Sequence, residues 1–297
     1  MNERAEPMTS YDKPWAYVVL TKPDVTFLVV ITTVAGFYLG STGAMNWALL
    51  LNTVLATMLV AGGTAALNQY IEREMDAVMR RTAARPLPSG ILRPRDVLVF
   101  GVGTILIGAL WLAVAVNVLS SLVALATSLL YLGLYTPLKT RTPLSTAVGA
   151  IPGALPPLIG WAAARGSLGL GGWVLVAILF FWQFPHFMAI AWMYREDYAR
   201  AGIRMLPVVD RSGDSTFRQI VCTSAILVWV SALPSVVGMA GKLYFFGALV
   251  LGMLLLQVGL WANRSRTNAR AKWLMHATVA HNPLLLAWLI LDKLVNR

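Results

Sequence analysis

The stretch Asn68-Gln-Tyr-Ile-Glu-Arg-Glu-Met-Asp-Ala-Val-Met-Arg-Arg-Thr-Ala-Ala-Arg-Pro-Leu-Pro-Ser-Gly90 follows an uncharged apolar run from Trp47 to Leu67. If the apolar helix continues through this stretch, Asn68, Glu72 and Asp76 lie along one face, because residues four apart are neighbours on a helix. These three side chains, which we call the ligand stripe, would then present a row of oxygen ligands.

Arginines accompany the ligand stripe on the same segment: Arg73, Arg80, Arg81 and Arg85. Guanidinium groups suit bidentate contact with phosphate oxygens. Mg2+ prefers carboxylates, waters and substrate phosphates to closed protein cages, so the combination indicates a magnesium-bridged phosphate. The alternative is a solvated helix end whose charges only balance one another. A membrane setting favours the functional interpretation, because polar groups there are costly.

The composition indicates an integral membrane protein. The hydrophobic fraction is 58% and the charged fraction 12%, whereas an ordinary soluble domain is about half apolar and about a quarter charged. The net charge of +11 in this class reports topology and contact with the anionic lipid bilayer, so we exclude nucleic acid as a partner. The single cysteine, Cys222, excludes an intrachain disulfide.

The apolar segments predict nine transmembrane helices, because each is about 20 residues long. They lie near residues 24–41, 46–67, 97–117, 118–136, 144–164, 172–193, 219–238, 243–262 and 273–291. We expect a cytoplasmic N-terminal segment, 1–23, and one all-α polytopic domain, 24–292, with long inner loops at 68–96 and 194–218.

The positive-inside rule supports this count. With the N-terminus in the cytoplasm and the C-terminus outside, the other side receives only Arg165, Lys242, Lys293 and Arg297. A cleavable signal and an Arg-rich transit peptide are both missing from the start of the chain, which favours a bacterial or archaeal cell membrane.

The second long inner loop supplies further acids. Asp197 follows the end of the sixth expected span, where it could face the ligand stripe and help to hold a second metal ion. The alternative is that it only offsets neighbouring arginines in water. Asp210 and Asp214 compete for the same role, but Ser212-Gly213 argues against a helix between them. We prefer Asp197.

Two more segments carry candidate residues. The short inner connection 135–142 brings Lys139 and Arg141 to the same side, either as phosphate ligands or only as positive-inside markers. His186 follows Pro185 in an aromatic helix, where a histidine is either hydrogen-bonded structure or functional. His276 and His281 have the same ambiguity.

Several motifs together resemble a known family. Asn68-x-x-x-Glu72-x-x-x-Asp76, then Met79-x-Arg81-Thr82-x-x-Arg85-Pro86-Leu87, resembles the first signature of the UbiA superfamily of intramembrane prenyltransferases. Four other motifs are similar to its haem-modifying branch, the protohaem IX farnesyltransferases or haem O synthases: Tyr135-Thr-Pro-Leu-Lys139-x-Arg141-Thr142, Gly149-Ala-Ile-Pro-Gly-Ala-Leu-Pro-Pro157, Trp182-Gln-Phe-Pro-His186-Phe and Asp197-Tyr-x-x-Ala-Gly-x-x-Met-Leu-Pro207. The similarity spans about residues 15 to 290.

The resemblance implies nine helices around a central cavity and transfer of farnesyl from farnesyl diphosphate to a vinyl group of haem B, giving haem O and diphosphate. It implies Mg2+ as cofactor and terminal oxidase assembly as destination, with haem A synthase or oxidase assembly proteins as expected partners. The site residues that it implies are, for Mg2+ and diphosphate, Asn68, Glu72, Asp76 and Asp197; for the phosphates, Arg73, Arg81, Arg85, Lys139 and Arg141; and for the haem side, His186.

One departure from the superfamily pattern concerns the second motif. Much of the superfamily has two aspartates four residues apart there, whereas this chain has Met193 and Ala201 on either side of Asp197. A fully symmetric two-metal site is therefore not expected from the resemblance alone.

Three alternatives stay open. A related prenyltransferase could act on a quinone precursor, on a chlorophyll or on another aromatic acceptor. A non-enzymatic haem chaperone could retain the fold, but loss of the ligand stripe would favour it, and the stripe is present. A secondary transporter is compatible with nine spans, but its charges would gather near the midplane.

Overall fold

The computed structural model describes residues 12–295, and the regular structure in this part of the chain is all helical, without strands. Within it, nine helical segments are long and apolar enough to cross a membrane, which confirms the predicted fold class. The short helices are α1 (Lys13–Leu20), α10 (Arg195–Arg200) and α11 (Leu206–Val209). The nine spans are α2 (Pro23–Gly40), α3 (Trp47–Val78), α4 (Pro94–Ala115), α5 (Val118–Leu129) with η1 (Leu130–Tyr135) and α6 (Thr136–Leu138), α7 (Ser145–Ala154) with α8 (Pro156–Arg165), α9 (Leu170–Met193), α12 (Asp214–Val230) with α13 (Leu233–Val236), α14 (Lys242–Ser265) and α15 (Asn268–Val295).

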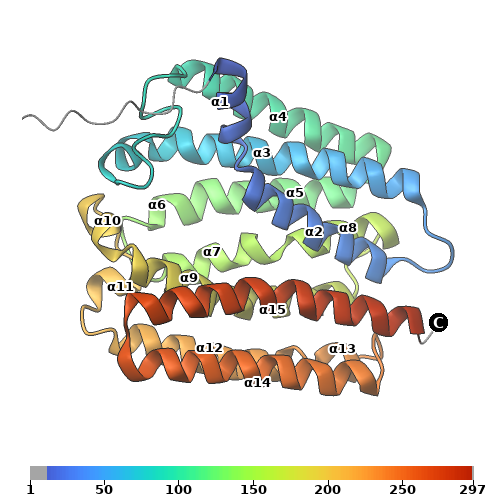
Figure 1. Cartoon of the computed structure of the whole chain (residues 1–297). Helices are drawn as coiled ribbons and strands as arrows, with labels where there is room; N and C mark the ends of the chain where they lie inside the picture. Colours follow the sequence, from blue (N-terminus) through green and yellow to red (C-terminus); the bar gives the residue numbers. More distant parts are fainter. Residues whose placement is uncertain (1–11, 296–297) are drawn as a thin grey trace, which may run out of the picture.

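The long helices run side by side along one direction (Figure 1), and their contacts form a ring. In the first half, α3 packs on α4 and α2 packs on α8; in the second half, α12, α14, α15 and α9 pack on one another, and α15 touches α2. Two large apolar clusters fill the bundle. One joins α9, α12, α14 and α15 and includes Leu39 of α2, Ala154 of α7 and Trp161 of α8, and the second joins α3, α4, α5 and α8.

Glycines allow α2 and α8 to touch backbone to backbone. A Cβ atom added at Gly160 would lie 1.9 Å from the carbonyl oxygen of Thr33, and one added at Gly36 would lie 1.9 Å from that of Pro157. Small residues at such crossings are typical of membrane helices, because they let the backbones approach. This contact fixes α8 against the first span.

The fifth span is broken, although the sequence predicts it as one uninterrupted segment, 144–164. α7 ends at Ala154 and α8 begins at Pro156. Proline lacks a backbone N–H and clashes with the preceding turn, so the run containing Pro156 and Pro157 cannot continue the helix ladder. Neighbouring side chains bind the carbonyl groups near the break: Gln183 Nε2 donates to Ala150 O at 3.0 Å and Thr33 Oγ1 to Pro156 O at 3.1 Å.

The helix ends near the ligand stripe are more ordered than the sequence alone suggests. α3 continues past Leu67 to Val78, so the ligand stripe lies on a helix and the loop expected at 68–96 begins only at Met79. The second inner loop contains α10 and α11, and α12 begins within it at Asp214. In Figure 1 the end of α3, α6, α10 and α11 all lie at the left end of the bundle.

The expected N-terminal segment, 1–23, contains a packed helix. Residues 1–11 lie outside the described part of the chain, but α1 buries Ala16 and Leu20 against Ala66 of α3 and Val97 of α4. The chain then turns at Thr21 and Lys22 and enters α2 at Pro23. This turn is therefore held beside α3, close to the ligand stripe.

Candidate active site

The structure places the ligand stripe on one buried face of α3. Asn68, Glu72 and Asp76 are 1%, 6% and 0% exposed. Buried charges in proteins are normally paired, because an isolated charge loses its hydration without compensation. The partners of these side chains therefore decide what the site can bind.

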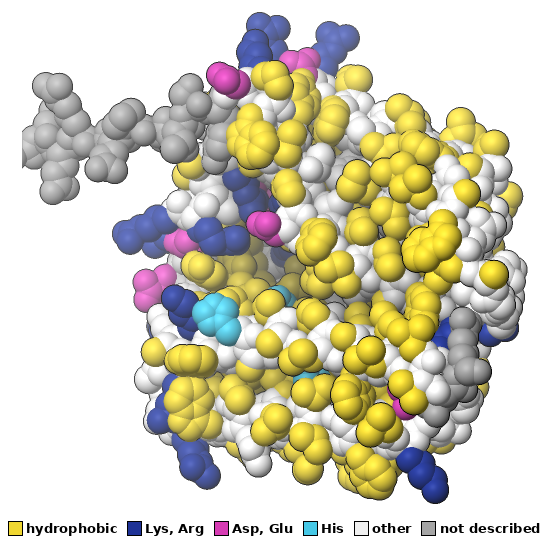
Figure 2. Space-filling view, turned by 45° about the vertical axis from the view of Figure 1, so that its right-hand side comes forward, with side chains coloured by type: hydrophobic (Ala, Val, Ile, Leu, Met, Phe, Trp, Pro, Cys, Tyr) yellow, Lys and Arg dark blue, Asp and Glu magenta, His cyan; other side chains and the backbone are white. Residues whose placement is uncertain are grey.

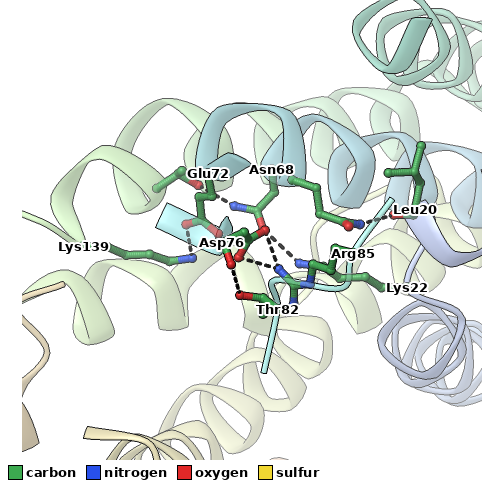
Figure 3. Close-up of polar contacts among 10 residues, drawn as sticks. Leu20, Lys22, Asn68, Glu72, Asp76, Thr82, Arg85 and Lys139 are labelled. Carbon is green, nitrogen blue, oxygen red and sulfur yellow. Dashed lines mark hydrogen bonds and ion pairs between the residues drawn. The ribbon is translucent and has the colours of Figure 1, made fainter. Parts of the chain in front are cut away.

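Each oxygen ligand of the stripe has a basic partner (Figure 3). Lys22 Nζ donates to Asn68 Oδ1 at 3.0 Å, and Lys139 Nζ donates to Glu72 Oε1 at 2.6 Å. Arg85 NH1 reaches both carboxylate oxygens of Asp76, at 2.8 Å and 2.7 Å. We call Lys22, Arg85 and Lys139 the basic triad.

The turn after α3 brings Arg85 back to the stripe. Thr82 Oγ1 donates to the carbonyl oxygen of Asp76 at 2.8 Å, and Ala83 N donates to Met79 O at 2.9 Å. These bonds reverse the chain directly after the helix ends. On the other side of the stripe, Asn68 Nδ2 donates to Thr136 Oγ1 at 3.3 Å, which ties α3 to the end of the fourth span.

Lys22 is a residue of this cluster that the sequence did not single out as a candidate. Its backbone is left-handed, with φ 46° and ψ 69°, a conformation that is costly for a residue with a Cβ. Gln69 Nε2 donates to Leu20 O at 2.8 Å and holds this turn against α3. A lysine directly before the proline that opens the first span, on the side of the stripe, is the signal that could have found it.

Burial and like charges weaken the protonation of Lys22. Desolvation is the largest cause, the positive charge of Arg85 comes next, and together with Lys139 they lower the pKa of Lys22 to about 7. Burial also disfavours charge on Lys139, but the neighbouring Tyr135 and Glu72 side chains outweigh it and hold the pKa of Lys139 above its usual range. Lys139 is therefore a lasting positive charge beside the stripe, whereas the charge of Lys22 is readily lost.

A π-helical turn places aromatic rings beside Lys139. Residues Leu130–Tyr135 form η1, a geometry that is frequent at functional sites. Lys139 Nζ lies 4.5 Å from the ring centroid of Tyr135 and 5.9 Å from that of Tyr131. Electron-rich ring faces next to the basic triad can stabilise positive charge through cation–π contact.

Three of the predicted phosphate residues are not drawn into this cluster. Arg73 donates to Tyr70 O at 2.9 Å and to Glu74 at 3.3 Å. Arg81 is exposed, with its guanidinium 5.1 Å from the ring centroid of Tyr194, and Arg141 is exposed as well. Of the five predicted phosphate residues, the structure thus brings Arg85 and Lys139 to the stripe.

Asp197 lies on α10, next to the end of α3. Its side chain is 12% exposed and forms an ion pair with Arg200. Ile203 and Met205, just beyond α10, pack with Met79 in one apolar cluster, and the backbone N–H of Arg204 donates to Lys139 O at 2.7 Å. The three inner segments therefore meet around the stripe, although the observed partner of Asp197 is an arginine of its own helix.

The competing acids of the second loop have structural partners. Asp210 accepts hydrogen bonds from Thr216 N at 2.8 Å and from Thr216 Oγ1 at 3.0 Å, at the start of α12. Asp214 pairs with Arg266 in the turn between α14 and α15. These contacts fix the start of α12 and give neither acid a contact with the ligand stripe.

The donor set of the stripe fits a magnesium ion that is shared with a phosphate. Among residues 12–295, no three histidine, cysteine or acidic side chains lie close enough together to hold a metal ion alone. Mg2+ usually takes one or two carboxylates and fills its other positions with waters and substrate phosphates. The buried Glu72, Asp76 and Asn68 oxygens beside three cations provide such a set.

His186 lies on α9, and its observed contacts are with α9 and α15. Its Nδ1 is 2.8 Å from Thr278 Oγ1, and its ring stacks on Trp182 at 4.9 Å between centroids. Trp182 Nε1 in turn donates to Thr278 O at 2.8 Å. These contacts fix the orientation of the imidazole.

Figure 2 shows a hollow near the left edge of one face, bordered by charged and histidine side chains, while apolar side chains cover most of the rest.

Comparison with known sequences identifies close relatives. The chain is 50% identical over 286 residues to the protoheme IX farnesyltransferase of Solibacter usitatus, covering 93% of this chain and 98% of that protein. It is 45% identical over 290 residues to the protoheme IX farnesyltransferase of Koribacter versatilis, covering 94% and 93%.

Solved structures share the fold at low identity. A digeranylgeranylglyceryl phosphate synthase superposes with a TM-score of 0.79 at 15% identity, covering 96% of this chain and 100% of that one. A UbiA homologue from Archaeoglobus fulgidus, solved with DMAPP and Mg2+, has a TM-score of 0.72 at 16% identity, covering 94% and 99%. The model of the UbiA prenyltransferase family matches residues 29–284. The chain therefore belongs to the UbiA prenyltransferase family.

Proposed function

We propose that the chain transfers the farnesyl group of farnesyl diphosphate to a vinyl group of haem B, giving haem O and diphosphate for terminal oxidase haem biosynthesis. The observation that carries this proposal is the 50% identity to a protoheme IX farnesyltransferase over 98% of that protein's length. The geometry of the buried stripe and its basic triad supports the diphosphate half of the reaction.

In this proposal the basic triad binds the diphosphate. Lys22, Arg85 and Lys139 turn from their present partners to the phosphate oxygens, and Arg85 can do so with two parallel hydrogen bonds. Arg73, Arg81 and Arg141, outside the cluster, draw the anion toward it by charge and complete its contacts. The inner loops then serve as the entrance for the diphosphate.

The ligand stripe, joined by Asp197, would hold Mg2+. Bound there, Mg2+ would supply positive charge against the leaving diphosphate. Use of Asp197 requires its carboxylate to leave Arg200. Mg2+ is also present in the solved UbiA homologue from Archaeoglobus fulgidus, which supports a divalent metal requirement in this fold.

The chemistry begins with cleavage of the bond between C1 of farnesyl and the diphosphate oxygen, whose electron pair leaves with the diphosphate. The basic triad stabilises that charge as it develops. The π electrons of the haem vinyl group attack C1, which leaves a cation on the vinyl carbon next to the porphyrin. Water adds to this carbon and releases a proton, so the product carries a hydroxyethylfarnesyl group.

His186 belongs to the haem side in this proposal. Its ring is held by Thr278 and Trp182 between α9 and α15, on other helices than the stripe. An imidazole and a flat indole at this position suit a porphyrin, through contact with the iron or with the ring. The two substrates would then approach from different walls of the bundle.

We further propose that residues 24–292 form one domain in a bacterial or archaeal cell membrane, with the N-terminus and the site loops in the cytoplasm and the C-terminus outside. The nine spans and the gathering of basic residues on one side support this orientation. Haem A synthase or terminal oxidase assembly proteins are the expected partners, because they would consume the product.

The second candidate is a prenyltransferase that acts on a quinone precursor or another aromatic acceptor. The fold leaves it open, since the digeranylgeranylglyceryl phosphate synthase shares the fold at a TM-score of 0.79. An acceptor competition separates the two. Purified protein receives labelled farnesyl diphosphate with equal amounts of haem B and a hydroxybenzoate. The proposal predicts label in the haem fraction, and label in the aromatic acid instead would replace haem with a quinone precursor.

A further inference from the structure

Every oxygen ligand of the stripe already accepts a hydrogen bond from a basic side chain in this structure. The three basic side chains come from separate parts of the chain: Lys22 from the turn before α2, Arg85 from the turn after α3, and Lys139 from the end of the fourth span. Pairs formed by neighbours on one helix are common on exposed surfaces and contribute little. Three distant segments converging on one buried face form a built arrangement (Figure 3).

These contacts are hard to break one at a time. The Asp76 and Glu72 side chains are 1% and 8% exposed in their ion pairs, and the Lys139 and Arg85 side chains are 12% and 22% exposed. Removing one partner from a buried pair leaves an uncompensated charge in a medium of low polarity. A ligand must therefore offer a new partner to the displaced cation as well as to the carboxylate.

The charge balance distinguishes a metal ion from a metal ion with diphosphate. The Asp76 and Glu72 carboxylates are already matched by Arg85 and Lys139, so the two pairs leave no unbalanced negative charge for a metal ion. A divalent ion entering alone would add positive charge at close range and displace the two basic side chains without giving them a partner. A prenyl diphosphate brings the negative charge that offsets the ion and accepts the displaced side chains.

We infer that Lys22, Arg85 and Lys139 prevent a divalent metal ion from binding to the ligand stripe by itself. They allow the metal ion to bind when diphosphate binds with it. The inference rests on the proposed function, because it assumes that the diphosphate binds at this cluster. The basic triad would then block the metal ligands in the free protein and bind the phosphate oxygens in the complex. Metal and diphosphate then bind as one unit, each raising the affinity for the other by the same factor.

Equilibrium dialysis of the purified full chain in detergent tests this inference, with radioactive Mn2+ and inorganic diphosphate as probes. The wild-type protein is expected to bind Mn2+ at least about tenfold more tightly with diphosphate than without it. Glu72→Gln should abolish the diphosphate-dependent Mn2+, which assigns that ion to the stripe. Equal Mn2+ affinity with and without diphosphate would overturn the inference.

Variants of the basic triad test whether these side chains block the binding of a metal ion alone. Lys139→Met frees the Glu72 carboxylate and should strengthen the binding of Mn2+ alone by about tenfold, while the coupling to diphosphate shrinks. Lys22 donates to the neutral amide of Asn68, so Lys22→Met should also strengthen the binding of Mn2+ alone without leaving an unpaired charge. This variant replaces Lys139→Met if that protein does not fold. Lys13→Met removes an exposed charge from α1 and should change nothing. If neither triad variant strengthens binding of Mn2+ alone, the inference is wrong.

The outcomes separate this inference from the proposed function. Coupled binding of Mn2+ and diphosphate without haem farnesylation would support the blocking role of the basic triad and reject haem as the acceptor. Haem farnesylation with Mn2+ bound equally well in the absence of diphosphate would support the proposed function and reject the blocking role. Failure to bind diphosphate under any condition would reject both.

Discussion

At the scale of single residues, Asp76 accepts three of the hydrogen bonds that hold the site together. Both of its carboxylate oxygens accept from Arg85, and its backbone carbonyl accepts from Thr82. We expect Asp76→Asn to abolish turnover while the protein stays folded, since the amide keeps the shape but loses the charge that orients Arg85 and that, in the proposed function, would hold the metal. Turnover and thermal unfolding in detergent measure the two effects. Asp210→Asn, at the cap of α12, should keep its turnover. Normal rates for Asp76→Asn would refute the metal assignment.

His186 provides the corresponding test of the haem side. We expect His186→Ala to weaken haem binding about tenfold or more while farnesyl diphosphate binding is retained, because the imidazole lies on α9 and the proposed diphosphate site lies around α3. Haem titration followed by absorbance measures the first effect. His276→Ala, an exposed histidine on α15, is the matched control. An unchanged haem titration for His186→Ala would reject this role.

The sequence predicted the ligand stripe but not all of its partners. Asn68, Glu72 and Asp76 repeat at helical spacing, so local geometry alone placed them on one face. The contact of Lys22 with Asn68 joins residues 46 positions apart, and no local pattern encodes such a pairing. Arg73 and Arg81 share the composition of a phosphate site but contact other partners, Tyr70 and Tyr194, whose positions no local pattern reveals.

At the scale of helices, the contact of α2 with α8 depends on Gly160. We expect Gly160→Ala to destabilise the protein by about 2 kcal/mol or more, because the new methyl group would meet the carbonyl oxygen of Thr33 in the opposing backbone. Gly103→Ala on α4 meets nothing within 4 Å and should be neutral or slightly stabilising, since alanine favours helix. Thermal unfolding in detergent compares the two. Equal melting temperatures would contradict the close packing.

The sequence predicted the number of spans better than their shape. Length and hydropathy located nine apolar segments, and the described part of the chain has nine. The extension of α3 to Val78 was only conditional in the sequence, because charged residues beyond a span fit a helix and a loop equally well. The break between α7 and α8 and the π-helical η1 depend on which neighbours bind the freed backbone groups, such as Gln183 beside Ala150.

At the scale of the whole molecule, the orientation in the membrane can be tested with single cysteines. In a Cys222→Ser background, Ala84→Cys lies in the first inner loop and Ser167→Cys lies in the connection between α8 and α9. A membrane-impermeant thiol reagent added to intact cells should label Ser167→Cys and spare Ala84→Cys, and inverted vesicles should reverse the result. The opposite pattern would place the site loops outside and refute the predicted topology.

Composition was sufficient to predict a membrane protein, and the motifs were sufficient to predict its family. The ring order of the helices was not predictable in the same way, because lipid-facing and partner-facing apolar surfaces look alike in sequence. The close approach of α2 to α8, and the division of the apolar core into clusters, became visible only with the structure.

The most direct test of the central claim is the mass spectrum of the haem recovered after purified protein is incubated with haem B, farnesyl diphosphate and Mg2+, with a parallel EDTA control. We predict a haem that has gained a hydroxyethylfarnesyl group, present with Mg2+ and absent with EDTA. Unmodified haem in both samples, from a protein that binds farnesyl diphosphate, would contradict the claim.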